Sequence, residues 1–194
     1  MKIAVDLDDV CVEYFRSVVA EVNHEFGTAL DYEETLSWDD NPLKRLDVFG
    51  EGRDWWTWME SRCHLWSRFP AVAGAVEGID ALKARGHYVE CLTSKPEWAR
   101  WVVWDWLALH QPDFDSVTIC PTGVPKHSLS HAGVLIDDAP HNVEAWTAKG
   151  RWAILFDRPW NRSIRPLDLT NCVRARGWNE VIEAVDAIEA TVTR

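Results

Sequence analysis

The sequence lacks any long hydrophobic run, and none approaches the ~18 apolar residues that suggest a membrane-spanning helix. Its first residues also lack the basic and then apolar layout of a signal peptide, because they enter a strand-like segment at once. The five cysteines are odd in number and show no CxxC spacing, which is typical of reduced, mostly buried thiols. We therefore expect a cytoplasmic protein that does not span a membrane.

Positive charge is scarce as well. The chain has 20 Lys and Arg residues against 31 Asp and Glu residues, and its formal net charge is -11. This acidic balance favours solubility and argues against broad binding to a nucleic acid polymer or to an anionic membrane. With 194 residues, of which 47% are hydrophobic and 26% are charged, the chain suits one globular domain with a small insertion.

Strand-like and helix-like segments alternate along most of the chain. Apolar runs of strand length predict strands at residues 2–5, 88–92, 117–120, 134–136 and 152–156. Helical spacing of apolar residues predicts helices at residues 12–26, 76–85, 97–110, 142–149 and 178–188. This alternation predicts an α/β fold with a doubly wound parallel sheet flanked by helices. Residues 28–73 interrupt the pattern, because they are acidic and rich in tryptophan.

Aspartates follow two of the predicted strands. Asp6, Asp8 and Asp9 lie where the first strand ends, and Asp137 and Asp138 follow a later one. In open α/β sheets the catalytic crevice lies outside the carboxyl ends of the strands, so we expect these side chains to meet there. Packed carboxylates repel one another unless a cation lies among them, and oxygen-only ligands favour a hard cation. The sequence therefore predicts a Mg²⁺ site suited to phosphate chemistry.

Four short segments at the predicted strand ends occur in a recognisable order. They are Asp6-Leu7-Asp8, Thr93-Ser94, Lys126 and Asp137-Asp138. In this order they resemble motifs I to IV of the haloacid dehalogenase-like hydrolases, over roughly residues 1–160. Two longer segments resemble the 5'(3')-deoxyribonucleotidase branch of that superfamily: Leu92-Thr93-Ser94 and Leu135-Ile136-Asp137-Asp138-Ala139-Pro140.

The resemblance implies how the chain divides. Residues 1–12 and 74–194 would form the catalytic core, a Rossmann-like parallel sheet flanked by helices. Residues 13–73 would form a small helical cap, inserted after the first strand and closing over the active site.

The same resemblance implies roles for the acidic residues. Asp6 would be the nucleophile that forms an aspartyl-phosphate intermediate. Asp8 would protonate the leaving alkoxide and then activate water, since positions i and i+2 of a strand point the same way. The carboxylate of Asp6, the backbone carbonyl of Asp8 and an acid of the second pair would bind Mg²⁺. The sequence leaves open whether Asp137 or Asp138 binds the ion directly.

The phosphate-binding residues also follow from the resemblance. Thr93 or Ser94 would donate a hydroxyl group and backbone N–H groups to the phosphate oxygens. Lys126 would hold a fixed positive charge against the phosphate and the nucleophile. The nearby Lys95 is the alternative, either in place of Lys126 or beside it.

Each motif also has a purely structural interpretation. Asp8-Asp9 and Thr93-Ser94 are each able to cap the helix that follows them. Asp137-Asp138 suits a turn before Pro140, and a single loop lysine such as Lys126 is usually solvated. These interpretations do not explain why all four segments occur in order, each after its own strand.

The 13 tryptophans are an unusual number for this length. One group lies on the helix predicted at residues 97–110 and suits packing or a homodimer surface: Trp98, Trp101, Trp104 and Trp106. A second group lies in the insertion: Trp55, Trp56, Trp58 and Trp66. Aromatic rings offer flat surfaces for a base, which makes Trp55 and Trp56 candidate substrate contacts. The alternative is that this group forms the small core of the cap.

These inferences predict a Mg²⁺-dependent phosphoric monoester hydrolase that converts (deoxy)nucleoside monophosphates to nucleoside and phosphate. Two alternatives remain: a phosphatase of the same fold for another small phosphorylated metabolite, and a non-catalytic binding module. The complete motif set favours an enzyme, because a decayed relative would lose Asp6 or Asp8 first. The sequence leaves open the base, the sugar, the position of the phosphate and the oligomeric state.

Overall fold

The computed structural model describes residues 1–38, 42–51 and 54–192. Within these residues, six strands form one parallel sheet in the order β3-β2-β1-β4-β5-β6. The strands are β1 (Lys2–Val5), β2 (Tyr88–Lys95), β3 (Ser116–Pro121), β4 (Val134–Asp137), β5 (Trp152–Phe156) and β6 (Cys172–Ala175). β1 lies inside the sheet, and the winding reverses between β1 and β4. The predicted α/β fold with a parallel sheet is confirmed.

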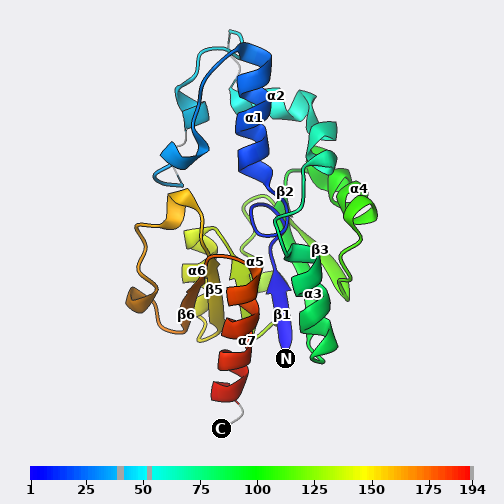
Figure 1. Ribbon diagram of the computed structural model, residues 1–194, viewed down its shortest axis with the longest axis vertical. Helices are drawn as coiled ribbons and strands as arrows, with labels where there is room; N and C mark the ends of the chain where they lie inside the picture. Colours follow the sequence, from blue (N-terminus) through cyan, green and yellow to red (C-terminus); the bar gives the residue numbers. More distant parts are fainter. Residues whose placement is uncertain (39–41, 52–53, 193–194) are drawn as a thin grey trace.

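Helices cover the sheet and the carboxyl ends of its strands (Figure 1). The α-helices of the described residues are α1 (Tyr14–Phe26), α2 (Trp55–Ser61), α3 (Ala75–Ala84), α4 (Arg100–His110), α5 (Lys126–Leu129), α6 (Pro140–Thr147) and α7 (Trp178–Val192). Short 3₁₀ helices lie between them: η1 (Tyr32–Glu34), η2 (Pro42–Arg45), η3 (Cys63–Arg68), η4 (Glu97–Ala99), η5 (Pro159–Asn161) and η6 (Pro166–Asp168). In Figure 1, α1 and α2 lie beyond the carboxyl end of β1.

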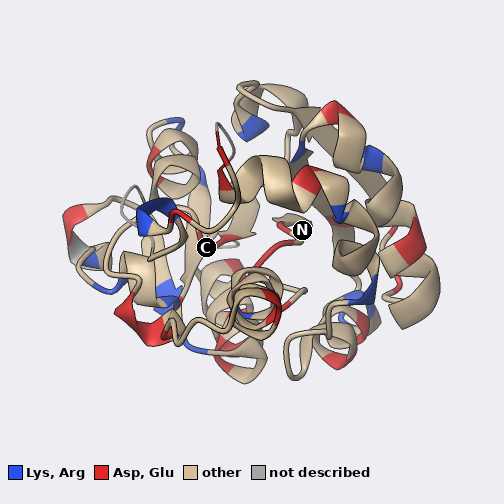
Figure 2. Cartoon of the chain, turned by 90° about the horizontal axis from the view of Figure 1, so that it is seen from above, with Lys and Arg blue, Asp and Glu red and all other residues tan. Residues whose placement is uncertain are grey.

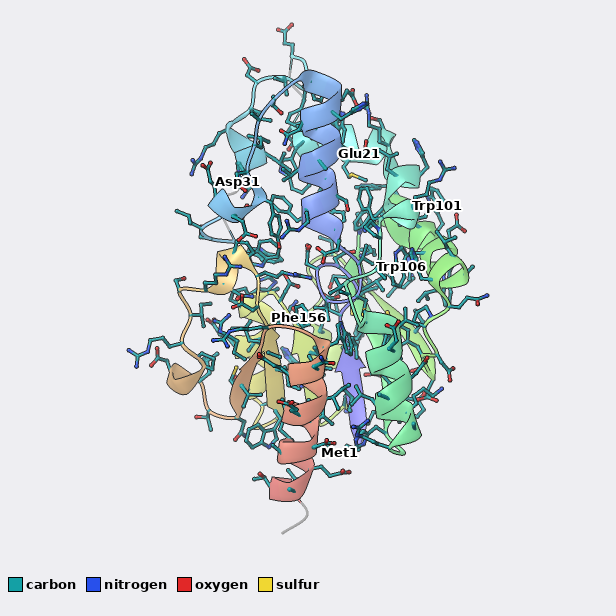
Figure 3. The ribbon with its side chains drawn as sticks, in the orientation of Figure 1. Met1, Glu21, Asp31, Trp101, Trp106 and Phe156 are labelled. Carbon is teal, nitrogen blue, oxygen red and sulfur yellow. The ribbon has the colours of Figure 1, made fainter. Side chains whose placement is uncertain are left out.

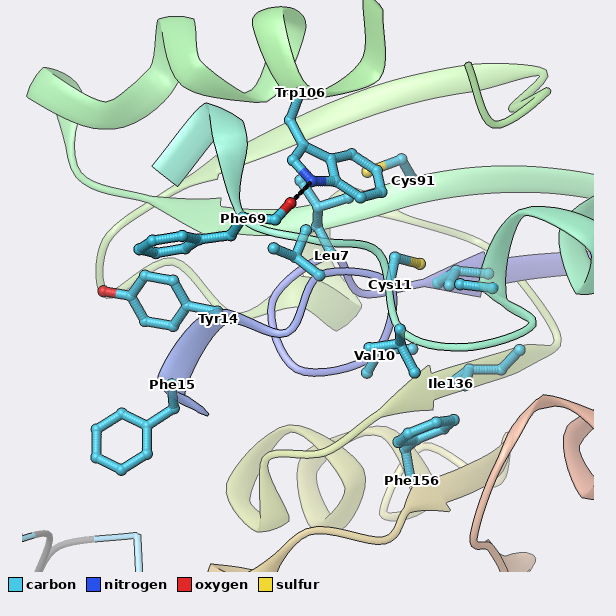
Figure 4. Close-up of a cluster of buried hydrophobic side chains, with 14 of the residues drawn as sticks. Leu7, Val10, Cys11, Tyr14, Phe15, Phe69, Cys91, Trp106, Ile136 and Phe156 are labelled. Carbon is cyan, nitrogen blue, oxygen red and sulfur yellow. Dashed lines mark hydrogen bonds between the residues drawn. The ribbon is translucent and has the colours of Figure 1, made fainter. Parts of the chain in front are cut away.

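The strands supply side chains to a hydrophobic cluster on each face of the sheet. Ile3 and Val5 of β1 belong to the cluster that includes residues of α3, α4 and α7, part of which is drawn in Figure 4. Ala4, between them, belongs to the cluster that includes Trp146 of α6. Successive side chains of a strand point to opposite faces, so a strand buried on both faces must be apolar at every position. This is why the central strands appear as unbroken apolar runs in the sequence.

Two strands differ from the prediction. β2 continues to Lys95 instead of ending at residue 92, because β3 pairs with it along this length and hydrogen-bonds its backbone. β6 was not predicted at all. It is a four-residue edge strand, and its Arg174 is held by Asp157 (2.7 Å), a partner that the local sequence does not indicate.

Helix α1 begins the segment between β1 and α3. Its apolar residues recur at helical spacing, and Phe15, Val18 and Val22 are buried. Gly27 ends the helix with a φ of 64°, a left-handed conformation that glycine adopts without a steric penalty. The predicted cap, residues 13–73, also contains η1, η2, α2 and η3, while residues 39–41 and 52–53 lie outside the described part of the chain.

The two connections between this segment and the sheet run side by side. The N–H of Glu13 donates to the carbonyl of Pro70 (2.9 Å), and the N–H of Val72 donates to the carbonyl of Cys11 (2.7 Å). The chain therefore leaves the core and returns to it at one place, directly above the end of β1.

Within the described residues, no helix combines the length and the apolar character needed to cross a membrane. All five cysteines lie in the described ranges and are free thiols, and Cys11, Cys91 and Cys120 are buried. Basic and acidic residues are distributed over all parts of the chain (Figure 2), so the net negative charge is not confined to one element.

Candidate active site

Asp6 lies at the carboxyl end of β1, beside the end of β4. Val5 is paired with Ile136, and the N–H of Asp6 donates to the carbonyl of Ile136 (2.9 Å). This pairing sets Asp6 next to Asp137, the last residue of β4. Because the winding of the sheet reverses here, this is the position at which open α/β sheets form their binding crevice.

Three carboxylates meet at this point. Asp6, Asp137 and Asp138 are buried, and each offers an oxygen within 4.8 Å of the others. Burial raises the pKa of Asp138 well above its ordinary value, and the negative charges of Asp137 and Asp9 act in the same direction. Three buried acids with insufficient positive charge around them are a suitable donor set for a hard divalent cation.

Lys126 brings a positive charge into contact with this cluster. Its Nζ lies 2.8 Å from Oδ1 of Asp6 and 2.7 Å from Oδ2 of Asp137. The side chain is buried on the short helix α5, so it is not the solvated loop lysine of the structural interpretation. Burial opposes its charge, yet the carboxylates of Asp137 and Asp6 raise the pKa of Lys126 above its ordinary value. Lys126 is therefore the lysine beside Asp6.

Asp137 and Asp138 have different partners. Asp137 accepts hydrogen bonds from the N–H of Ala139 (2.9 Å) and from Nδ2 of Asn142 (3.1 Å), in addition to its ion pair with Lys126. Asp138 accepts a hydrogen bond from Nε1 of Trp160 (3.0 Å) and lines the cavity described below. Asp137 thus holds the surrounding residues together, whereas Asp138 faces the open space.

Asp8 lies between Lys95 and Trp66. One carboxylate oxygen forms an ion pair with Nζ of Lys95, and the other accepts a hydrogen bond from Nε1 of Trp66 (2.9 Å). Nζ of Lys95 also donates to Oγ1 of Thr93 (3.1 Å). Burial raises the pKa of Asp8, while the positive charge of Lys95 opposes that shift. Of the two candidate lysines, Lys95 therefore contacts Asp8 and Lys126 contacts Asp6.

The two hydroxyl residues of β2 are separated by the alternation of the strand. Thr93 is fully buried and is bound to Lys95, whereas Ser94 lines the cavity. Of these two residues, only Ser94 is therefore placed to contact a substrate.

The loop after β1 is held by residues from distant parts of the chain. Nε of Arg158 donates to the carbonyl of Asp9 (2.6 Å), and Nε1 of Trp178 donates to the carbonyl of Val10 (3.0 Å). Asp9 has a φ of 55°, which non-glycine residues rarely adopt. Its carboxylate accepts the N–H of Phe15 (3.0 Å) in the first turn of α1. Asp9 therefore has the structural, helix-capping role that the sequence offered for Asp8-Asp9.

A cavity of about 340 Å³ opens above these groups. The predicted site residues that line it are Asp6, Asp8, Ser94, Lys126, Asp138, Trp55 and Trp56. Further lining residues were not predicted to be in the site: Asp9, Tyr14, Phe15, Thr35, Ser37, Trp38, Lys44, Trp66, Ala139, His141, Asn142 and Trp160. A pocket of this size, lined by both aromatic and charged or polar side chains, suits a small organic molecule that carries a charged group.

A family model described as 5' nucleotidase, deoxy (pyrimidine), cytosolic type C protein matches residues 1–192. The chain belongs to this family. It is thus a phosphatase of the haloacid dehalogenase-like superfamily, and the resemblance inferred from the four motifs is confirmed. A comparison with curated proteins found no significant match.

Solved structures share the fold of this nucleotidase-family chain. The HAD-hydrolase YfnB from Bacillus subtilis, bound to magnesium, is 11% identical with a TM-score of 0.65, covering 94% of this chain and 96% of its own. A haloacid dehalogenase-like hydrolase from Xanthomonas campestris is 17% identical with a TM-score of 0.63, covering 100% and 98%. CbbY from Rhodobacter sphaeroides, in complex with phosphate, is 14% identical with a TM-score of 0.61, covering 95% and 98%.

Proposed function

We propose that this member of the nucleotidase family is a Mg²⁺-dependent phosphatase that hydrolyses nucleoside monophosphates through an aspartyl-phosphate on Asp6. The observation that carries the proposal is that one cavity joins two different surfaces. At its base are Asp6, Lys126 and Asp138, and on its wall are Trp55 and Trp56. The first surface suits a phosphate with a metal ion, and the second suits a flat base.

The donor set at the base fits Mg²⁺. Asp6, Asp137 and Asp138 present oxygen atoms only, and their negative charge exceeds what Lys126 neutralises. We assign Asp6 and Asp138 as the carboxylate ligands, because both line the cavity while Asp137 is occupied by Lys126 and Asn142. When bound, the ion supplies positive charge that lowers the repulsion between a phosphate dianion and the acidic site.

In the first step, an oxygen of Asp6 attacks the phosphorus atom and the bond from phosphorus to the ester oxygen breaks. Asp8 gives its proton to the departing alkoxide, and the nucleoside leaves as an alcohol. Lys126 holds Asp6 in place through the 2.8 Å contact with Oδ1. Ser94, at the same end of the cavity, is placed to donate a hydrogen bond to the phosphate.

In the second step, Asp8 takes a proton from a water molecule, and the oxygen of that water bonds to phosphorus. The bond between phosphorus and Asp6 then breaks, which releases phosphate and restores the Asp6 carboxylate. Asp8 is protonated again and ready for the next ester. The two steps use the same two residues with their proton roles reversed.

The upper part of the cavity suits a nucleoside. Trp55 and Trp56 lie on its wall, edge to face with their ring centroids 5.1 Å apart. Tyr14 and Thr35 also line it, and within the described residues their buried hydroxyl groups have no hydrogen-bond partner. A ligand with polar groups would satisfy them, whereas an aliphatic one would not. Both the aromatic surface and the free hydroxyls therefore favour a substrate with a base and a sugar.

The direct test is to measure phosphate release from a panel of phosphomonoesters with Mg²⁺ present. The panel holds 5'- and 3'-nucleoside monophosphates, in deoxy and ribo forms, together with sugar phosphates of similar charge. Stacking of a base on an aromatic ring is worth ~1–3 kcal/mol, so we expect kcat/KM for nucleotides to exceed that for sugar phosphates by about tenfold or more. Equal values for both groups would contradict the nucleotide assignment and leave the phosphatase intact.

The metal requirement is tested separately. Activity should disappear in excess chelator and return when Mg²⁺ is added back. Mg²⁺ alone should also raise the melting temperature, because binding to the folded state stabilises it and relieves repulsion among Asp6, Asp137 and Asp138. Full activity in chelator would contradict this part of the proposal.

We also propose that the chain divides into a catalytic core and a cap, and that the protein is located in the cytoplasm. Residues 13–73 would act as the cap, since α1 and α2 lie beyond the carboxyl end of β1 (Figure 1) and the first two residues of α2, Trp55 and Trp56, line the cavity. A cytoplasmic location agrees with the free thiols. It is tested by fractionating cells that express the tagged chain, and recovery outside the cytoplasm would contradict it.

A further inference from the structure

Asp8 is held on both of its oxygens by groups that come from different parts of the chain. Lys95 belongs to β2, and Trp66 belongs to η3 in the segment between β1 and α3. Nζ of Lys95 also lies 4.4 Å from the centre of the Trp66 ring, which adds a cation–π contact between the two. The side chains of Asp8, Lys95 and Trp66 therefore contact one another pairwise and form a closed group.

Trp66 is fixed by its surroundings. Its side chain is buried, and its ring stacks on Tyr14 with a centroid distance of 4.3 Å. The residues that follow η3 are tied to helix α4, since Nε1 of Trp106 donates to the carbonyl of Phe69 (2.9 Å), as Figure 4 shows. The indole of Trp66 thus points at Asp8, and the packing around it holds the ring in this position.

Lys95 is fixed as well, and it is not part of the cavity lining. Its side chain is fully buried, and its ammonium group is shared between Asp8 and Thr93. The Asp8 side chain is 22% exposed and borders the cavity, so one edge of the carboxylate remains open to a substrate. Each carboxylate oxygen has a second lone pair, so these donors fix the carboxylate plane without preventing proton transfer.

We propose that Lys95 and Trp66 are positioning residues that clamp Asp8 in the orientation needed to pass a proton to the leaving group. The proposal rests on the proposed phosphatase function and deepens it. It also replaces the phosphate-binding role that the sequence suggested for Lys95. A flexible aspartate would sample several rotamers, whereas the clamp selects one, and an error of about 1 Å in such a group can cost ~10²-fold in rate.

The test uses the fact that proton donation matters only for poor leaving groups. kcat/KM is measured for a series of aryl phosphates, from dinitrophenyl phosphate, whose leaving group needs no proton, to phenyl phosphate, whose leaving group does. Trp66→Phe keeps an aromatic ring on the wall and removes the N–H that holds Asp8. We expect about a tenfold or larger loss for phenyl phosphate and a much smaller loss for dinitrophenyl phosphate.

Trp56→Phe is the matched control. Trp56 lines the same wall but is packed against Trp55 and Trp98, while Asp8 is bound by Trp66. This control should change kcat/KM by a similar factor along the whole series, because it alters binding and not proton transfer. An unchanged dependence on the leaving group in Trp66→Phe would overturn the clamp.

Lys95→Met provides a second, independent variant. It should increase the dependence on the leaving group in the same direction, and circular dichroism with thermal melting shows whether it has folded. If it does not fold, the result for Trp66→Phe decides alone. The aryl phosphates contain no nucleotide, so the comparison of the variants does not depend on the nucleotide assignment. That assignment is tested separately, by the panel of phosphomonoesters with the wild-type protein.

Discussion

Asp6 and Asp8 are separated by a single residue, and the protein surrounds them differently. Asp6 is bound by Lys126 and by the N–H of Leu7 (2.8 Å), both on the same oxygen. Asp8 has Lys95 on one oxygen and an indole N–H on the other. Two carboxylates in unlike environments are able to serve as nucleophile and as proton carrier at the same pH.

Replacing these two residues should have different consequences. Asp6→Asn removes the attacking anion with little change in volume, so we expect phosphatase activity to fall to background. Asp8→Asn removes the proton carrier, and a loss of ~10²–10⁴-fold is expected, with phosphorylated Asp6 accumulating when the leaving group needs no proton. Intact-protein mass spectrometry after mixing with dinitrophenyl phosphate detects the added phosphoryl group. Near-normal turnover by a folded Asp6→Asn variant would rule out the covalent mechanism.

His87 lies at the opposite end of the sheet and links stability to pH. Its ring is buried, with Nδ1 3.1 Å from the ammonium group of Met1. Burial lowers the pKa of His87 below its ordinary value of 6.5, the positive N-terminus and Arg85 act in the same direction, and Glu189 and Asp186 oppose it. Below pH 6.5 the unfolded chain therefore takes up a proton that the folded protein does not.

The contribution of His87 to the free energy of unfolding should therefore decrease as the pH falls below 6.5, and be constant above it. His87→Gln does not titrate, so below pH 6.5 the wild-type protein should lose stability relative to this variant as the pH falls. Urea unfolding at a series of pH values measures both slopes. Parallel curves for the two proteins would show that His87 does not contribute.

At the scale of secondary structure, helices α3 and α7 pack closely through a glycine. A Cβ atom at Gly78 of α3 would lie 2.3 Å from Cε3 of Trp178 in α7. The indole has little freedom to move, because its Nε1 is bound to the carbonyl of Val10. The close approach therefore requires glycine at position 78.

Gly78→Ala should destabilise the protein. Overpacking in a core typically costs ~1–3 kcal/mol, which exceeds the gain of about 1 kcal/mol for replacing glycine by alanine in a helix. Thermal melting measures the loss. Gly133→Ala is the control, since the nearest atom to its new Cβ would be the Lys2 carbonyl oxygen at 4.0 Å, and its melting temperature should change little. Equal effects in both variants would contradict the packing argument.

The four tryptophans that the sequence groups in the insertion differ in their surroundings. Trp58 and Trp66 are buried, whereas Trp55 and Trp56 are partly exposed. Trp55, Trp56 and Trp66 line the cavity, but the Nε1 of Trp66 is bound to Asp8. The sequence offered base stacking and core formation as alternatives for this group, and the positions suit core formation for Trp58 and base stacking for Trp55 and Trp56.

Trp55→Ala or Trp56→Ala should therefore affect nucleotides selectively. Loss of a stacking surface worth ~1–3 kcal/mol lowers kcat/KM for deoxynucleoside monophosphates by roughly tenfold or more. Phenyl phosphate has no base, so its kcat/KM should change less. Steady-state kinetics on both substrates checks this, and equal losses would assign these residues a structural role.

Part of this architecture follows from local sequence and part does not. The apolar runs that became β1, β4 and β5 are recognisable because both faces of the sheet bury them. The acids Asp6 and Asp137 are recognisable because they follow those runs. The choice between Lys95 and Lys126 depends on contacts that no spacing rule supplies. Lys95 contacts Asp8, 87 residues away in the sequence, and Lys126 contacts Asp137, 11 residues away. The bond from Trp66 to Asp8, across 58 residues, is hidden from sequence for the same reason.

On the surface of the molecule, helix α4 exposes several large apolar side chains. Trp106 of this helix is buried against the core, whereas Trp101 is 44% and Trp104 is 54% exposed, and Figure 3 labels Trp101 at the outer side of the helix. Leu109, near the end of the helix, is also exposed. The sequence indicated packing or a homodimer surface for these tryptophans, and the exposed members suit the second.

We expect the protein to self-associate through this surface. Sedimentation velocity over a range of concentrations should show a dimer, and Trp104→Glu should shift the distribution to the monomer, because a buried unpaired charge opposes association. Glu97→Gln, an exposed change on the neighbouring η4, is the control and should leave the distribution unchanged. A wild-type monomer at all concentrations would contradict the expectation.

The bonds from Arg158 and Trp178 to the loop after β1 have a consequence for the time at which the enzyme becomes active. During synthesis this loop leaves the ribosome well before the two side chains that hold it, which lie 149 and 168 residues further along the chain. A nascent chain therefore carries its nucleophile on a loop that has not yet acquired its shape. Catalytic competence would arise only once residue 178 has emerged, and an interrupted chain that lacks this residue would remain inactive.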